Sequence, residues 1–259
     1  MRSPFRLRRV AAAAAVALGT VLTGTLLTGP ALAAPAAAEE IPEFSHEDCP
    51  ALPDGAVPGY WLCNAVVVSG GEFSFGSFEQ QIETPMRLVY ANGFDAETFE
   101  ETAILASFES EWMTVQEGIF GDPFVTAVYA KPEAVDLDLV NGNVQLDLKV
   151  RLKNPLLGRH CTIGTDDDPI ELDLTIGTTN PPPPNEPISG SPPVDVSTDP
   201  WVVKTTLVDN AFAVPGADDC GIADSANWLV DLIAGLPSAA GGNTAIFEQY
   251  VAAKSYTDL

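Results

Sequence analysis

The chain has 259 residues, of which 36 are Asp or Glu and 12 are Lys or Arg, so its formal charge at pH 7 is −24. This balance excludes a nucleic-acid-binding protein that neutralises phosphates, because such a protein needs a basic surface. It also argues against docking on an anionic membrane. A hydrophobic content of 46% excludes wholesale disorder.

The N-terminus has the pattern of a secretory signal peptide. Basic residues come first, an apolar stretch follows over residues 10–29, and Ala31-Leu32-Ala33 supplies the small residues of a cleavage site. We expect residues 1–33 to be a signal peptide, with cleavage after Ala33 or after Ala38. The alternative is an uncleaved membrane anchor, since about 20 apolar residues can just span a bilayer. The weak hydrophobicity of Ala and Gly favours cleavage, which predicts a secreted protein, extracellular or cell-wall associated, without an integral membrane segment.

The region after the leader is predicted to be disulfide-bonded. Residues 34–48 are rich in Ala, Pro and Glu and predict a flexible lead-in. The four cysteines are Cys49, Cys63, Cys161 and Cys220. An even number in an exported chain predicts two disulfides, for which three pairings are possible. We favour Cys49–Cys63, which closes a short loop, and Cys161–Cys220, which ties distant segments together.

The first half of the chain carries several strand patterns. Apolar and β-branched residues predict strands at 62–68, 86–90 and 124–129. Residues 95–112 are ambiguous, because their Glu-rich composition suits a helix while their apolar residues form only a partial stripe.

The clearest pattern is a β-hairpin. Apolar and charged residues alternate over 135–140 and over 143–153, on both sides of Asn141-Gly142. This dipeptide accepts positive φ at both central positions of a turn, which matches the twist of two antiparallel strands. The apolar members are therefore expected to face a core and the charged members to face water. The expected core positions are Leu137, Leu139, Val144, Leu146, Leu148, Val150 and Leu152.

Strand patterns continue toward the C-terminus. They lie at 170–176, 201–208 and 245–251, the last of which could also form a helix. One short helix is expected to begin with Ser225 as its N-cap and to end near Ala234. Four apolar residues share one face of this helix: Trp228, Leu229, Leu232 and Ile233.

These elements predict a mainly β fold: an antiparallel β-sandwich or barrel with one short helix in the C-terminal region. Residues 49–259 are expected to form a single all-β secreted domain, in which the Pro-rich stretch 180–200 is a surface loop. The alternative makes this stretch a linker between two domains. A Cys161–Cys220 disulfide would tie its two sides together, which favours one domain.

The sequence offers no complete catalytic motif. Gly71 to Gly76 contains a serine between glycines, but the spacing differs from that of a nucleophile elbow. A Ser-His-Asp triad would depend on His46 or His160, which lie beside cysteines expected to form disulfides. Zinc is disfavoured as well, because no C-x-x-C pair accompanies these two histidines. P-loop and dinucleotide-binding motifs are missing from the sequence. We therefore assign no catalytic residue and no cofactor.

Carboxylates leave two further possibilities open. A glycoside hydrolase needs two of them at a suitable distance, and Glu109-Ser110-Glu111-Trp112 places acids beside an aromatic residue. The densest acidic clusters are Asp166-Asp167-Asp168 and Asp218-Asp219. Calcium takes six to eight oxygen ligands, so Asp166, Asp167 and Asp168 are weak candidates for a calcium site. An ordinary polar turn before Pro169 is the favoured explanation of these residues.

Several segments resemble a known family. They are Asn154 to Gly158, Cys161 to Gly164, Ile170 to Gly190, Leu207 to Gly216, Cys220-Gly221 and Gly235 to Gly241. Together they resemble a family of uncharacterised secreted proteins from actinomycetes, which carry a leader and have no assigned activity. The resemblance covers roughly residues 150–245. It implies export and the Cys161–Cys220 pairing, and it transfers no functional residue.

The sequence thus predicts a secreted, non-catalytic structural or interaction protein of the cell envelope or extracellular space, with an envelope or glycan partner. The alternatives are a carbohydrate-active or other hydrolase that uses two carboxylates, and a calcium-dependent binding module.

Overall fold

The computed structural model describes residues 40–94, 98–116 and 127–259. The chain divides into two units, residues 1–39 and residues 40–259, and every described strand and helix belongs to the second unit. The predicted signal peptide, residues 34–39 of the predicted lead-in, and residues 124–126 of one predicted strand lie outside the described residues.

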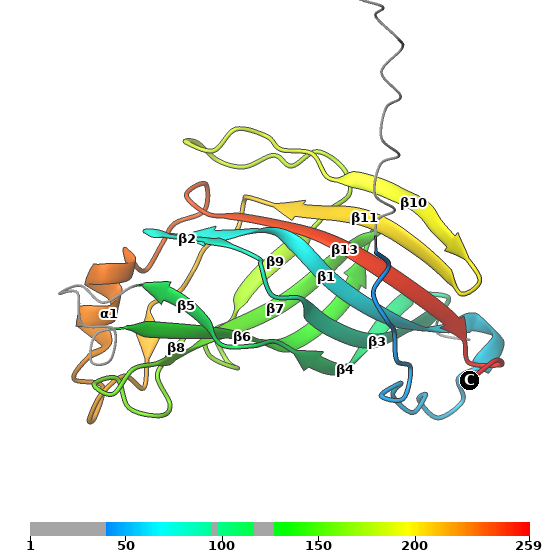
Figure 1. The fold of residues 1–259 in the computed structure, drawn as a ribbon, viewed down its shortest axis with the longest axis horizontal. Helices are drawn as coiled ribbons and strands as arrows, with labels where there is room; N and C mark the ends of the chain where they lie inside the picture. Colours follow the sequence, from blue (N-terminus) through cyan, green and yellow to red (C-terminus); the bar gives the residue numbers. More distant parts are fainter. Residues whose placement is uncertain (1–39, 95–97, 117–126) are drawn as a thin grey trace, which may run out of the picture. The chain divides into compact units, whose positions relative to one another are not determined.

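Antiparallel strands form two sheets (Figure 1). In sheet A the strand order is β10 (Ser191–Thr198), β11 (Trp201–Asp209), β13 (Thr244–Ser255), β1 (Trp61–Phe75), β3 (Met86–Phe94) and β4 (Glu101–Glu109), and β2 (Phe78–Gln81) also pairs with β1. In sheet B the order is β12 (Ala217–Asp218), β8 (Thr162–Ile163), β7 (Asn143–Lys153), β6 (Val128–Val140) and β5 (Met113–Gln116), and β9 (Ile170–Leu174) also pairs with β7. The sheets do not close into a barrel, so the fold is a β-sandwich, with a single α-helix and a short 3-10 helix, η1 (Pro58–Tyr60), in the described part.

The predicted hairpin is confirmed. Strands β6 and β7 pair along their length, and Asn141 and Gly142 between them adopt φ values of 54° and 83°. Five of the seven expected core residues are buried: Leu137, Leu146, Leu148, Val150 and Leu152. Val144 is half-buried against the same core. Leu139, near the turn, is also only half-buried.

The main core lies between the two sheets. Sheet A contributes Val66, Leu88 and Phe247, and sheet B contributes Leu146, Leu172 and other alternate residues of its strands. Because strand side chains alternate between faces, each sheet turns one apolar face inward. Full burial of a side chain of this size contributes about 1.5–3 kcal/mol.

Both predicted disulfides are present. Cys161–Cys220 links the start of β8 to the segment before the helix, across 59 residues. Cys49–Cys63 ties the N-terminal segment to β1, across 14 residues. That segment lies against the outer face of sheet A, where Phe44 packs on Val202, Tyr250 and Ala252.

The described residues of the predicted lead-in, 40–48, contact the strands of the sandwich. Three contacts fix residues 40–48: Arg87 donates a hydrogen bond to the Glu43 carbonyl, His46 Nε2 lies 3.1 Å from the Ala252 carbonyl oxygen, and Ser107 donates to Asp48. The composition of the lead-in could not reveal these contacts, because the residues that make them belong to strands distant in sequence.

Two ambiguous segments form strands. Residues 101–109, which a helix also suited, form β4, because pairing with β3 and packing of Leu105 and Phe108 on the core outweigh local composition. The last predicted strand is β13, which lies between β11 and β1. In the Pro-rich stretch, residues 191–198 form the edge strand β10 within the same unit.

The α-helix, α1 (Asn227–Ala234), differs from its prediction. Its N-cap is Ala226 rather than Ser225, and no side chain caps it. The predicted apolar face is exposed, led by Leu232 at 72% and Trp228 at 63%, while Val230 and Ala234 are buried. Polar contacts set this orientation: Ala217 N–H donates to Asp231, and Cys220 N–H donates to Asn227. Across the described residues, no helix is long and apolar enough to cross a bilayer.

The two disulfides should contribute unequally to stability. In the chain-entropy model a longer closed loop restricts the unfolded chain more, giving about 4 kcal/mol for the 59-residue separation and about 3 kcal/mol for the 14-residue one. We expect the Cys161→Ala/Cys220→Ala variant to lose more unfolding free energy than the Cys49→Ala/Cys63→Ala variant in urea titrations. The reverse order would contradict this loop-entropy explanation.

Candidate ligand-binding cleft

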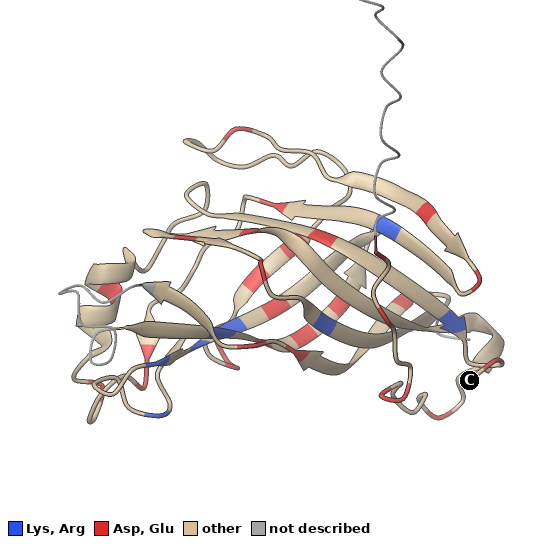
Figure 2. Cartoon of the chain, viewed as in Figure 1, with Lys and Arg blue, Asp and Glu red and all other residues tan. Residues whose placement is uncertain are grey.

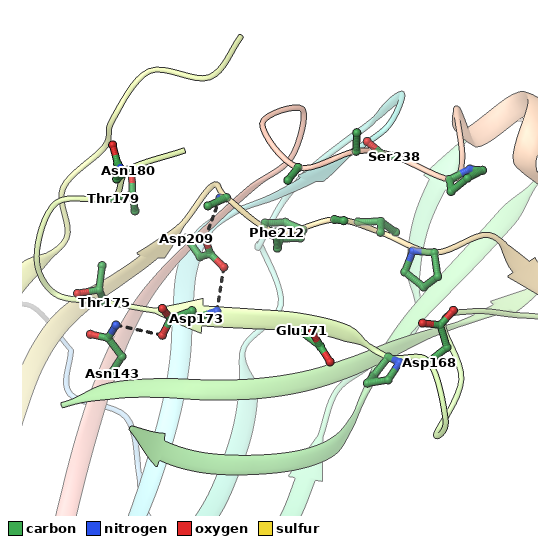
Figure 3. A pocket seen from close by; sticks show the side chains of 18 of the residues that line it. Asn143, Asp168, Glu171, Asp173, Thr175, Thr179, Asn180, Asp209, Phe212 and Ser238 are labelled. Atoms are coloured by element: carbon green, nitrogen blue, oxygen red, sulfur yellow. Dashed lines mark hydrogen bonds between the residues drawn. The ribbon is translucent and has the colours of Figure 1, made fainter. Parts of the chain in front are cut away.

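A cleft of about 950 Å³ lies beside β9. Its walls come from β9, from the segments 178–180 and 209–215, and from residues 237–240 (Figure 3). The lining includes four carboxylates, which are Asp168, Glu171, Asp173 and Asp209, together with threonine, serine and asparagine side chains. Ala211, Ala213 and Pro215 supply apolar surface, and the buried Phe212 and Val214 lie between them. None of the lining residues is Lys or Arg, so the cleft carries uncompensated negative charge.

Strand periodicity places the acidic side chains of β9. Ile170, Leu172 and Leu174 are buried in the core, and Glu171 and Asp173 alternate with them on the exposed face. Asn143, at the start of β7, donates a hydrogen bond of 3.0 Å to the Asp173 carboxylate. The alternation expected over residues 170–176 holds over 170–174, where it positions two of the cleft's four acids. Ile176, beyond the end of the strand, is exposed.

Asp209 closes one side of the cleft and is only 3% exposed. Its Oδ1 accepts the Ala211 N–H at 2.8 Å, and its Oδ2 accepts the Asp173 N–H at 2.9 Å. Burial raises the pKa of the Asp209 carboxyl and the Asp173 charge adds to this, while backbone hydrogen bonds from Ala211, Asp173 and Asn210 lower the pKa. With both oxygens engaged, Asp209 holds the β9 edge and the 209–211 turn together.

A buried amide network supports the cleft from behind. We use this name for Asn185, Asn210, Asn243 and Thr179. Asn243 is 1% exposed and makes four hydrogen bonds: its amide donates to the Phe212 and Ala239 carbonyls, and its Oδ1 accepts from Gly76 N–H and the Ser238 hydroxyl. This is the full capacity of an asparagine side chain. It fixes two walls of the cleft relative to β1.

The other members of the network hold the Pro-rich loop. Asn210 donates to the Glu186 carbonyl, and Thr179 donates to Asn210 Oδ1 at 2.6 Å. Asn185 donates to the carbonyls of Asn210 and Asn243. The cleft is therefore built on loops whose polar groups are satisfied within the protein, which favours a preformed shape.

A row of carboxylates extends from the cleft across sheet B. Asp136 of β6 pairs in register with Asp147 of β7, which pairs with Glu171 of β9. We call these three residues the carboxylate row, and Figure 2 shows the acidic positions along these strands in red. Burial raises the pKa of the Asp147 carboxyl, and the charges of Glu171 and Asp136 add to the shift. Like charges directly opposite in a sheet are destabilising.

The acidic triplet predicted as a calcium candidate is divided. Asp168 lines the cleft, whereas Asp166 and Asp167 line a second hollow of about 450 Å³, which also contains Asp218 and Asp219. Lys149 and Arg151 lie in that hollow, and Lys149 forms an ion pair with Asp166. Within the described ranges no group of three or more His, Cys, Asp or Glu side chains is arranged to hold a metal ion.

The remaining candidate residues lie away from the cleft. His46 contacts sheet A, and His160 lines the second hollow. These are the chain's two histidines, so the cleft has no Ser-His pair. Trp112 lies under Lys153, whose Nζ is 5.5 Å from the ring centroid, and neither Glu109 nor Glu111 lines the cleft.

Sequence reasoning did not identify Asp209 or the amide network. Asn185, Asn210 and Asn243 are asparagines in loops, where this residue type is ordinary. Three-dimensional contacts give them their roles. The segments 170–190 and 207–216, on which the family resemblance rests, meet at the cleft.

Comparison of the chain with protein-family models, curated proteins and solved structures finds no match.

Asn243→Ala should destabilise the fold by about 2–3 kcal/mol, because buried donors and acceptors lose their partners. The exposed cleft residue Asn180 offers a matched control, and Asn180→Ala should change the unfolding free energy by less than about 0.5 kcal/mol. Urea titration of both variants measures the difference. Equal stabilities would contradict the role given to the amide network.

Asp147→Asn should stabilise the protein at pH 7 by about 0.2–1 kcal/mol, because it removes repulsion within the carboxylate row. The folded pKa of Asp147 lies above the unfolded value of about 3.9. The native state thus binds more protons between these values, and Asp147's unfavourable contribution fades as the pH falls through the folded pKa. Urea titrations at pH 7 and pH 4 should show the gain shrinking.

The control for Asp147→Asn is Asp138→Asn, on the neighbouring strand. Asp138 faces Gln145 rather than an acid, so its substitution should change stability less at pH 7. A loss of stability in Asp147→Asn at pH 7 would contradict the repulsion.

Proposed function

We propose that this protein is a secreted, non-catalytic interaction protein that binds an extracellular or envelope ligand in the cleft beside β9. The observation that carries the proposal is the cleft itself: an acidic, hydroxyl- and amide-lined hollow held by the buried amide network. Its volume of about 950 Å³ lies within the range of ligand sites. The leader pattern, the two disulfides and the resemblance to secreted actinomycete proteins support export.

The chemistry of the cleft favours binding over turnover. Ser238 donates its hydroxyl proton to Asn243, an amide that cannot act as a general base. Asp209 uses both carboxylate oxygens to accept backbone N–H groups. The groups left for a ligand are the acids and hydroxyls of the exposed wall, which accept and donate hydrogen bonds.

A hydrolase that uses two carboxylates is the second candidate. One observation favours it, since the cleft collects Asp168, Glu171, Asp173 and Asp209 along one hollow. The exposed aromatic platform that would help to bind a sugar is missing from the lining residues, because the cleft's aromatic residue, Phe212, is 5% exposed.

The test combines binding and turnover on one purified protein. We expect a panel of oligosaccharides and peptides to include a ligand that raises the melting temperature without being cleaved, since a ligand of the native state stabilises it. The Glu171→Gln/Asp173→Asn variant should lose this rise. Glu79→Gln, an exposed acid on β2 outside the cleft, should retain it.

Other outcomes decide between the alternatives. Saturable cleavage of a glycoside, ester or peptide, lost in the cleft variant, would overturn the non-catalytic proposal and support the hydrolase. A melting temperature that differs between calcium chloride and EDTA would support calcium-dependent binding instead. Export is tested by expressing the full chain in a secreting bacterial host and sequencing the N-terminus of the product, which should begin after Ala33 or Ala38.

A further inference from the structure

Strand β9 has one free edge, and this edge borders the cleft. β9 pairs with β7 on one side only. In an antiparallel strand the N–H and C=O groups of alternate residues point to the same side. The Asp173 N–H points away from β7, because it donates to Asp209. The main-chain groups of Glu171 therefore also point away from β7, toward the cleft.

The free edge begins next to a single bridge between the sheets. Thr175 and Val208 exchange two main-chain hydrogen bonds, Thr175 N to Val208 O at 3.0 Å and Val208 N to Thr175 O at 2.9 Å. Continued pairing would place residue 210 opposite Asp173 and residue 212 opposite Glu171. The chain instead turns away after Asp209, the last residue of β11, and the Asp209 side chain takes the Asp173 N–H. The cleft of about 950 Å³ lies in this opening, and Glu171 lines it.

This edge differs from that of β10, one of the two edge strands of sheet A. Strand β10 carries Pro192 and Pro193, and its ladder is irregular at two places. Proline and irregular pairing protect an edge against added strands. The sequence of β9, Ile-Glu-Leu-Asp-Leu, contains no proline and pairs regularly with β7.

Charge identifies the kind of strand that fits. An added antiparallel strand would place one residue directly opposite Glu171 and extend the carboxylate row by one position. A Lys or Arg at that position would meet Glu171 across the strands and relieve the repulsion along the row. Since the lining residues include no base, the positive charge has to come from the ligand.

We propose that the cleft binds an extended, positively charged peptide segment, which adds to the free edge of β9 as an antiparallel strand. This inference rests on the proposed binding function and names its ligand class. Main-chain hydrogen bonds to Glu171 supply affinity, and alternate basic side chains opposite the acidic wall supply selectivity.

The probe is a fluorescein-labelled ten-residue peptide of alternating Lys and Thr, followed by fluorescence anisotropy. A residue opposite Glu171 exchanges both main-chain hydrogen bonds with it. If a lysine of the peptide lies opposite Glu171, the main-chain amides of the lysines face β9 and those of the threonines face away. N-methylation of the lysine amides should therefore weaken binding about tenfold or more. N-methylation of the threonine amides, at unchanged charge, should leave binding nearly intact.

Protein variants supply the second half of the test. Glu171→Gln should weaken binding of the Lys-Thr peptide several-fold, and Glu79→Gln should not. A peptide of alternating Glu and Thr should not bind, and raised salt should weaken the Lys-Thr complex.

The possible failures are distinguishable. Equal binding of both N-methylated peptides would overturn strand addition and leave a charge-driven binding protein. Binding of an oligosaccharide in the cleft, with no binding of the Lys-Thr peptide, would overturn the ligand class alone. Cleavage of the peptide, lost in the Glu171→Gln/Asp173→Asn variant, would overturn the proposed function as well.

Discussion

The hydrogen bonds between Thr175 and Val208 are the constraint on which the cleft depends. They join Thr175, which directly follows β9 of one sheet, to β11 of the other, so the two sheets are hydrogen-bonded to each other there. Immediately afterwards the strands diverge, because Asp209 gives a side-chain oxygen to the Asp173 N–H in place of a main-chain partner. A sandwich closed along this edge would have no hollow beside β9. Divergence after one bridge creates both the hollow and the free edge that borders it.

Keeping such an opening in a small domain requires support from behind. Each loop around the cleft carries main-chain polar groups that a sheet would have paired, and an unpaired buried group is costly. The amide network meets this need: Asn243 bonds to three loop segments and to Gly76, and Asn185 and Asn210 attach the Pro-rich loop. The Cys161–Cys220 disulfide ties the start of β8 to the segment between the cleft residues 209–215 and α1. The cleft thus has a fixed frame and an exposed acidic wall.

Turn chemistry, strand alternation and cysteine spacing predicted the elements whose structure depends on residues close in sequence. The Asn141-Gly142 hairpin followed from turn chemistry and alternation, and cysteine spacing favoured the observed pairs. The helix orientation could not be predicted this way, since Asp231 and Asn227 bond to main-chain groups that only the tertiary fold brings near. The same limit applies to the site. Alternation placed Glu171 and Asp173 on a wet face, but the opening beside them depends on Asp209, which the sequence shows only as one acid among 36.

The arrangement of the acids argues that the charge of this protein is more than a solubilising coat. A coat requires only that exposed positions be charged, and alternation along each strand would provide it without placing acids opposite one another. The register instead aligns Asp136, Asp147 and Glu171 across three strands. Local rules that are broken at a cost in stability are typical of functional sites. The carboxylate row ends at Glu171, on the free edge of β9, where no further strand is paired. A cationic group that approaches this edge from outside would therefore meet the negative charge of Glu171 directly.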